Sequence, residues 1–111
     1  MLRAISESDW KLFRQLRPIA LERFCQRVLA EVERIASDGS KTSHERYLAV
    51  FKLIEKRDRE LAVAFDDPRR STALQQLAWI HSYALLTDEE MDRFTPETRD
   101  IVQLLAGTSR V

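Results

Sequence analysis

The chain has 111 residues with 18 basic and 18 acidic side chains, and its formal net charge of zero lacks the basic excess that nucleic-acid-binding domains carry. Its 44% hydrophobic content is enough for one modest core, which fits a single domain. Two glycines and three prolines leave few helix breakers, so the composition favours helices joined by short connections.

The N-terminal segment predicts one long helix with a proline inside it. Ser6 can accept a hydrogen bond from the backbone N–H of Asp9, as an N-cap residue does. Pro18 removes one backbone hydrogen bond and clashes with the preceding turn, which costs ~3 kcal/mol in a helix interior. Because the apolar spacing is nearly kept across Pro18, we expect one helix kinked near residues 14–17 rather than two helices. Its apolar positions are Trp10, Phe13, Leu16, Ala20, Leu21, Phe24, Val28, Val32 and Ile35.

The segment at about 43–66 predicts a long central helix on which the shorter helices pack. Thr42 and Glu45 have the spacing of a capping box, and the residue before Pro68 disfavours helical geometry. Between these limits, apolar residues recur at steps of three and four and share one helix face. They are Tyr47, Phe51, Ile54, Leu61 and Phe65.

The C-terminal third predicts short helices. Asp67 can cap a third helix that has Pro68 at its first position. Thr87 and Glu90 form a second capping box, and Pro96 opens a last helix that Gly107 can end. We therefore expect an all-α, irregular bundle of four to five helices, with a single domain at 1–107 and a frayed tail at 108–111.

Six consecutive charged residues, Glu55 to Glu60, interrupt the apolar seam of the central helix at Asp58. Such runs usually face solvent, and this is the interpretation we favour. Alternatively, Asp58 points inward and needs a cation, because an unpaired carboxylate in a core is costly. The candidate polar site of this second interpretation consists of Arg57, Asp58 and His81.

The sequence lacks the usual catalytic and metal-binding motifs. His44-Glu45 begins like a zinc-protease helix, but Leu48 stands where the second histidine belongs. There is no phosphate-binding loop and no nucleophile elbow, and Cys25 lies inside an apolar seam. We therefore expect no enzyme activity, no cofactor and no metal site.

The cysteine count and the hydropathy pattern bear on location. A single cysteine, Cys25, excludes an internal disulfide and fits a reducing compartment. The longest charge-free run, 71–87, is too short and too polar to span a bilayer. We expect a soluble, cytoplasmic protein without a membrane segment.

Five cations could form a small basic patch that binds nucleic acid. Its members are Lys11, Arg14, Arg17, Arg69 and Arg70. In a helix-turn-helix interpretation of residues 72–94, the groove-entering helix would begin with three acids, where the DNA backbone requires cations. Charge therefore disfavours nucleic acid as a partner.

The aromatic and aliphatic seams supply candidate interface residues, because such side chains anchor protein interfaces. These residues are Leu21, Phe24, Val28, Val32, Tyr47, Phe51 and Trp79. We expect a non-enzymatic interaction or regulatory module that forms a homodimer or binds another protein. A nucleic-acid-binding protein and a small-ligand-binding protein or enzyme are the two alternatives.

Three stretches of the sequence are similar to segments of known proteins: ALERFCQRVLAEVERI, HERYLAVFKLIEKRDRELAVAFDD and LLTDEEMDRFTPETRDIVQLL. With them the chain resembles a group of short bacterial proteins whose activity is uncharacterised. The resemblance covers most of the chain and implies a compact helical protein. It contains no catalytic motif and therefore implies no site residues.

Overall fold

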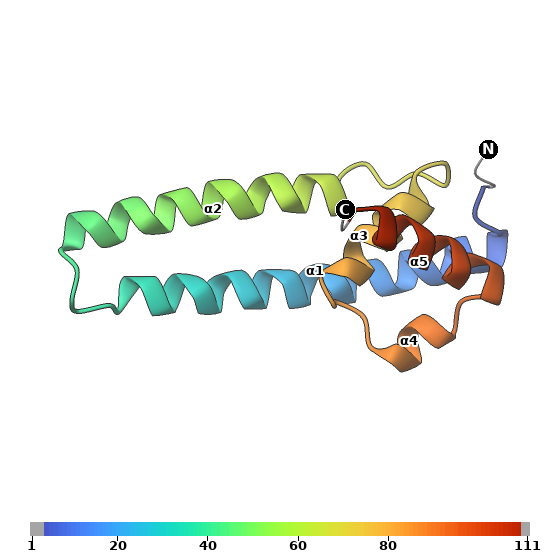
Figure 1. Cartoon of the computed structure of the whole chain (residues 1–111), viewed down its shortest axis with the longest axis horizontal. Helices are drawn as coiled ribbons and strands as arrows, with labels where there is room; N and C mark the ends of the chain where they lie inside the picture. The colour runs from blue at the N-terminus through green and yellow to red at the C-terminus, as the bar shows by residue number, and fades with distance from the viewer. Residues whose placement is uncertain (1–3, 110–111) are drawn as a thin grey trace.

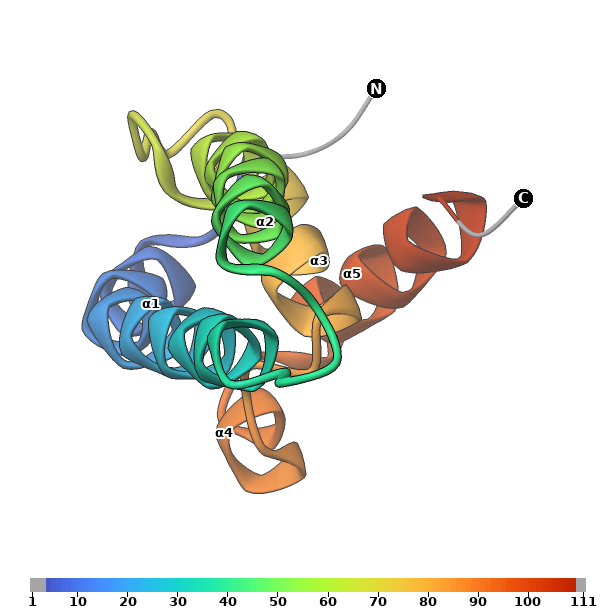
Figure 2. The same cartoon turned by 90° about the vertical axis from the view of Figure 1, so that its left-hand side faces the viewer.

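The computed structural model describes residues 4–109 and contains five helices (Figure 1). They are α1 (Glu7–Ala36), α2 (Ser43–Phe65), α3 (Ala73–Ser82), α4 (Asp88–Asp92) and α5 (Pro96–Ser109). The described residues form no β-strand, which confirms the predicted all-α class. Helices α1 and α2 form an antiparallel hairpin, and the other three helices gather at one end of it (Figures 1 and 2). The fold is therefore an elongated hairpin on a base, which is formed by α3, α4 and α5. The molecule measures 51 × 25 × 23 Å.

Helix α1 runs through Pro18 without a break over 30 residues, so the prediction of one helix is confirmed. The backbone N–H of Asp9 donates to the Ser6 hydroxyl at 3.2 Å, which is the predicted N-cap. The kink near residues 14–17 stays a prediction. Seven residues of α1 are buried, and six of them form its packing seam: Leu12, Phe13, Leu16, Ala20, Phe24 and Val28.

Helix α2 matches the predicted central helix and packs against both α1 and α3, but it is not the longest helix of the described residues. Its capping box between Thr42 and Glu45 is present as predicted. However, α2 is seven residues shorter than α1 (30 against 23), and its buried residues, Ala64 and Phe65, lie at its last turn. The base packs on both helices of the hairpin, because α3 lies against α2 as well as against α1.

Two predicted helix ends are also corrected. Asp67 does not cap α3, because its φ of 48° lies in the left-handed region, whereas an N-cap residue needs an extended backbone. The chain turns through residues 66–72 instead, and α3 begins at Ala73. Helix α5 passes Gly107 and ends at Ser109, while the rest of the predicted tail, 110–111, lies outside the described residues.

The first turn of α1 is tied to the start of α5 by a buried carboxylate. Asp9, 2% exposed, accepts hydrogen bonds from the hydroxyls of Thr98 at 2.6 Å and Thr95 at 2.7 Å. Burial raises the pKa of Asp9, but these hydrogen bonds and the one from the Thr95 backbone outweigh it and hold the pKa below its ordinary value. The charged form is therefore the one that joins two segments 86 residues apart.

Arginine side chains close the C-terminal ends of three helices. Arg46 donates to the Ala36 carbonyl at the end of α1 at 2.5 Å, and Arg17 donates to the Phe65 carbonyl at the end of α2. Arg27 donates to the carbonyls of the two residues that follow α3, Tyr83 and Ala84. Helix ends leave carbonyls without intrahelical partners and carry negative potential, so a guanidinium there both donates hydrogen bonds and neutralises charge.

An ion pair joins helix α4 to α1, in addition to the burial of Met91 in the core. Arg23 donates to the two carboxylate oxygens of Glu90 at 2.7 and 3.1 Å, and also to the Leu85 carbonyl at 2.8 Å. Glu90 completes the predicted capping box with Thr87 as well. Chiefly because of the hydrogen bond from Arg23, the pKa of Glu90 falls from 4.5 to about 2.

The lowered pKa of Glu90 predicts a measurable pH dependence. Its stabilising effect is complete above pH 4.5 and is lost as the pH falls towards 2, because only the ionised form makes the pair. We expect Glu90→Gln to lower the free energy of unfolding by about 1–2 kcal/mol at pH 7 and by much less at pH 2.5. Urea denaturation at both pH values measures this difference.

The matched control is Glu89→Gln, since Glu89 is the exposed neighbour. Its effect should stay within about 0.5 kcal/mol at both pH values. If Glu90→Gln cost the same at pH 2.5 as at pH 7, the Arg23–Glu90 pair would not be what holds α4.

Candidate interaction surface

The distal part of the hairpin, residues 25–61, is called the arm here, and its two broad sides differ. Arg27 and Glu60 face the base, because Arg27 bonds the residues after α3 and Glu60 interacts with the Tyr83 hydroxyl. Successive helix residues are rotated by ~100°, so Cys25, Leu29 and Asp58 point to nearly the opposite side. Figure 2 shows α3 and α5 on one side of the hairpin pair. Within residues 4–109, no helix covers the side that bears these three residues, which is called the open face.

Two apolar grooves run along the open face. The groove near the hairpin turn has a volume of about 510 Å³ and is lined by Ala36, Ser43, Arg46, Tyr47, Val50, Phe51 and Ile54. The groove nearer the base has a volume of about 330 Å³ and is lined by Phe24, Cys25, Val28, Leu29, Ile54, Arg57, Asp58 and Leu61. Ile54 lines both grooves, so they lie end to end between α1 and α2, and together they are called the trough here.

The side chains along this trough are unusually accessible for their size and polarity. Leu29 is 60% exposed, Tyr47 67%, Phe51 55% and Ile54 43%. Single exposed apolar residues are common, but a contiguous set marks a contact surface. The open face is therefore the strongest candidate site in the described part of the chain.

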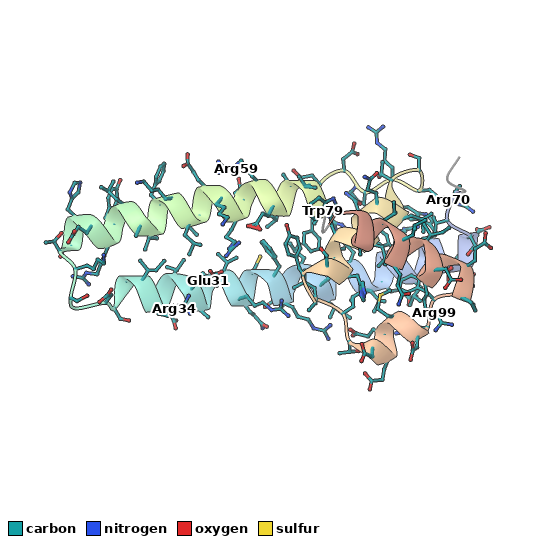
Figure 3. The ribbon with its side chains drawn as sticks, in the orientation of Figure 1. Glu31, Arg34, Arg59, Arg70, Trp79 and Arg99 are labelled. Carbon is teal, nitrogen blue, oxygen red and sulfur yellow. The ribbon has the colours of Figure 1, made fainter. Side chains whose placement is uncertain are left out.

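A polar layer holds the two helices together beneath the open face. Arg57 donates to both carboxylate oxygens of Glu31, at 3.1 and 3.0 Å, and to Glu60 at 2.5 Å. Figure 3 shows Glu31 reaching into the space between α1 and α2. The hydrogen bond from Arg57 lowers the pKa of Glu31, while those to Glu31 and Glu60 raise the pKa of Arg57. This charge network takes the place of the apolar core that the middle of α2 lacks.

The structure does not bring the predicted polar site together. Arg57 lies between the helices, and Asp58 is exposed on the open face. His81 lines a separate cleft of about 280 Å³ formed by α3, α4 and α5, among residues that include Asp88, Asp92 and Arg99. The exposed interpretation of the charged run is the one the structure supports. In the described residues, no three His, Cys, Asp or Glu side chains are arranged to hold a metal ion.

Each of the five cations of the predicted basic patch makes a contact within the chain. Lys11 lies 4.0 Å from Glu7, and Arg69 lies 2.8 Å from Asp67. Arg14 lies over the Trp10 ring, while Arg17 and Arg70 donate to backbone carbonyls. Contacts within the chain therefore reduce what these cations could offer to a phosphate backbone.

The predicted interface residues fall into three groups. Tyr47 and Phe51 lie on the open face, Phe24 and Val28 are buried beneath it, and Leu21 and Val32 are partly buried against the core. Trp79 belongs to the base instead, where it stacks on Tyr83 with ring centroids 6.0 Å apart. Sequence reasoning missed Leu29, although its position four residues after Cys25 places it in the same row of α1.

Comparison with protein-family models, with curated proteins and with solved structures gives no match to this chain. Between residues 4 and 109, none of the helices combines the length and the hydropathy needed to cross a bilayer.

The Arg57 network yields a direct prediction about the arm. Arg57→Ala leaves Glu31 and Glu60 without their shared cation, so we expect the free energy of unfolding to fall by about 1–3 kcal/mol. Arg59→Ala is the matched control, because Arg59 points away from α1 (Figure 3). Its effect should lie within about 0.5 kcal/mol. Equal losses of stability in urea denaturation would mean that the network does not hold the arm.

Proposed function

We propose that this protein is a non-enzymatic protein–protein interaction module whose docking surface is the open face of the arm. The observation that carries the proposal is the pair of adjoining apolar grooves on that face, with exposed Leu29, Tyr47 and Phe51 among their lining residues. Burying such large side chains stabilises a complex by roughly 1.5–3 kcal/mol each, so a partner that covers the trough gains substantially.

The distribution of reactive side chains also supports a binding role. Cys25 lines the trough, whereas His81 lies in the cleft of the base, so the two do not form a nucleophile and base pair. The nucleic-acid alternative is weakened by the engagement of its five cations, and the small-ligand alternative by the separation of Asp58 from His81.

The partner is a second copy of the chain or another protein. Either can lay helices into the trough, because a groove between two helices receives a third through ridges of apolar side chains. The proposal includes a cytoplasmic setting, in which the single thiol stays reduced.

Photo-crosslinking in the producing cell tests this proposal. A photoreactive amino acid at position 29 should yield one or a few discrete covalent adducts with a polypeptide, because Leu29 borders the trough. The same amino acid at position 30 is the matched control, since Ala30 is exposed and points to a different side of α1. Equal adduct patterns from both positions, or none from position 29, would contradict a docking surface on the open face.

The side chains of the open face should also be dispensable for folding. We expect Leu29→Glu to change the free energy of unfolding by no more than about 0.5 kcal/mol, because a 60% exposed leucine contributes little to the core. The same variant should abolish the adducts formed from a photoreactive group at position 51. Unchanged adducts would place the contact elsewhere.

A further inference from the structure

The charges on the open face distinguish between the two kinds of partner. Asp58 lines the trough itself, and no ion pair or hydrogen bond of the described residues engages its side chain. Glu55 lies one helical turn before it, and Glu22 and Glu33 share the row of Leu29 on α1. Carboxylates therefore border an apolar trough on both of its helices.

The cations of the arm either bond within the hairpin or lie away from the trough. Arg46 and Arg57 line the trough, but each donates to acceptors within the hairpin. Arg34 and Lys56 point to the opposite side, because helical rotation places them ~180° from Cys25 and ~200° from Asp58 respectively. The long side chains of Lys52 and Arg59 lie on the outer edge of α2 (Arg59 in Figure 3).

Three partners are disfavoured by this arrangement. A second copy packed face to face would bury Asp58 of both chains, while the two cations that line the trough, Arg46 and Arg57, are already bonded within their own hairpin. An unpaired buried carboxylate is strongly destabilising. An anionic membrane surface and a nucleic acid would both be repelled by the bordering carboxylates. Arg57 lines the same groove as Asp58, but its guanidinium donates to Glu31 and Glu60 instead, so the Asp58 carboxylate is left for a cation of the partner.

We infer that the occupant is a cationic amphipathic helix of another protein, with Lys or Arg beside its apolar stripe and one such cation opposite Asp58. This inference rests on the proposed function and names the partner of the same surface. The trough extends along α1 from Cys25 to Ala36, a length of ~17 Å, which fits about three turns of helix. Apolar anchors at positions i, i+3 or i+4, and i+7 would enter the trough, and the cation would lie towards the base.

A charge-swap experiment with two synthetic peptides tests the inference. Both peptides are 14-residue amphipathic helices with the same leucine stripe; one carries lysines beside the stripe, and the other carries glutamates in their place. Binding is measured by calorimetry on the full chain. The site is located by protection of the single thiol, Cys25, from a maleimide, because Cys25 lines the trough.

We expect the lysine peptide to bind the wild-type chain at least about tenfold more tightly than the glutamate peptide and to protect Cys25. Asp58→Lys should reverse this preference, and because Asp58 is exposed the variant should fold like wild type, which its thermal midpoint checks. Glu89→Lys, the same charge change on α4, is the matched control and should leave the preference unchanged.

The other outcomes separate the inference from the proposed function. If both peptides protect Cys25 with equal affinity, or if Asp58→Lys does not alter the preference, the trough is a docking site but the cationic helix is wrong. If light scattering shows a dimer that protects Cys25 without any peptide, the occupant is a second copy. If no peptide protects Cys25 and the chain is a monomer, the proposed function fails as well.

Discussion

A long continuous helix, α1, is the constraint on which the rest of the structure depends. Its 30 residues extend for ~45 Å, while its buried side chains begin at Asp9 and end at Val28. Helices α3 to α5 cover that buried part and gather around it at one end of the hairpin (Figure 1). The last two turns of α1 therefore contain no fully buried side chain, although Val32 packs partly against the core, and α2 is the helix that accompanies them.

Polar contacts therefore supplement a sparse apolar packing in the arm, to which Val28, Val32 and Leu61 contribute. Arg57 bridges Glu31 and Glu60 in its middle, and Arg46 closes its tip by bonding the Ala36 carbonyl. Such contacts can hold two helices in register while leaving their apolar side chains unused. Segments with few buried contacts also open more readily than the core, which suits a surface that adjusts to a partner. The small number of buried apolar contacts in the arm therefore accounts both for its polar network and for the exposed side chains of the proposed docking surface.

The sequence predicted the features that depend on local chemistry. The N-caps at Ser6, Thr42 and Thr87 are all present, because a cap needs only neighbours three residues away. Prediction from the sequence failed where contacts between distant residues determine the local structure. Aspartate is a favoured N-cap residue, but the backbone of Asp67 has a left-handed conformation. The Gln76 side chain also donates a hydrogen bond to the Asp66 carbonyl in the same loop. The predicted neighbours Asp58 and His81 lie on different surfaces because α3 packs on the opposite side of α2. The lining of the trough was predicted in part. Tyr47 and Phe51 were predicted as interface residues, whereas Leu29 was missed because it lies outside the main apolar seam of α1.

The central claim is that residues 4–109 leave the open face of the arm uncovered. Solution NMR with a soluble gadolinium chelate measures this directly, since the chelate broadens the methyl signals that it can approach. In a dilute sample of the protein alone, the methyl signals of Leu29 and Ile54 should broaden strongly, while those of the buried Leu77 and Ile80 should stay sharp. Methyl signals of Leu29 and Ile54 as sharp as those of Leu77 and Ile80 would show that the face is covered and would contradict the account.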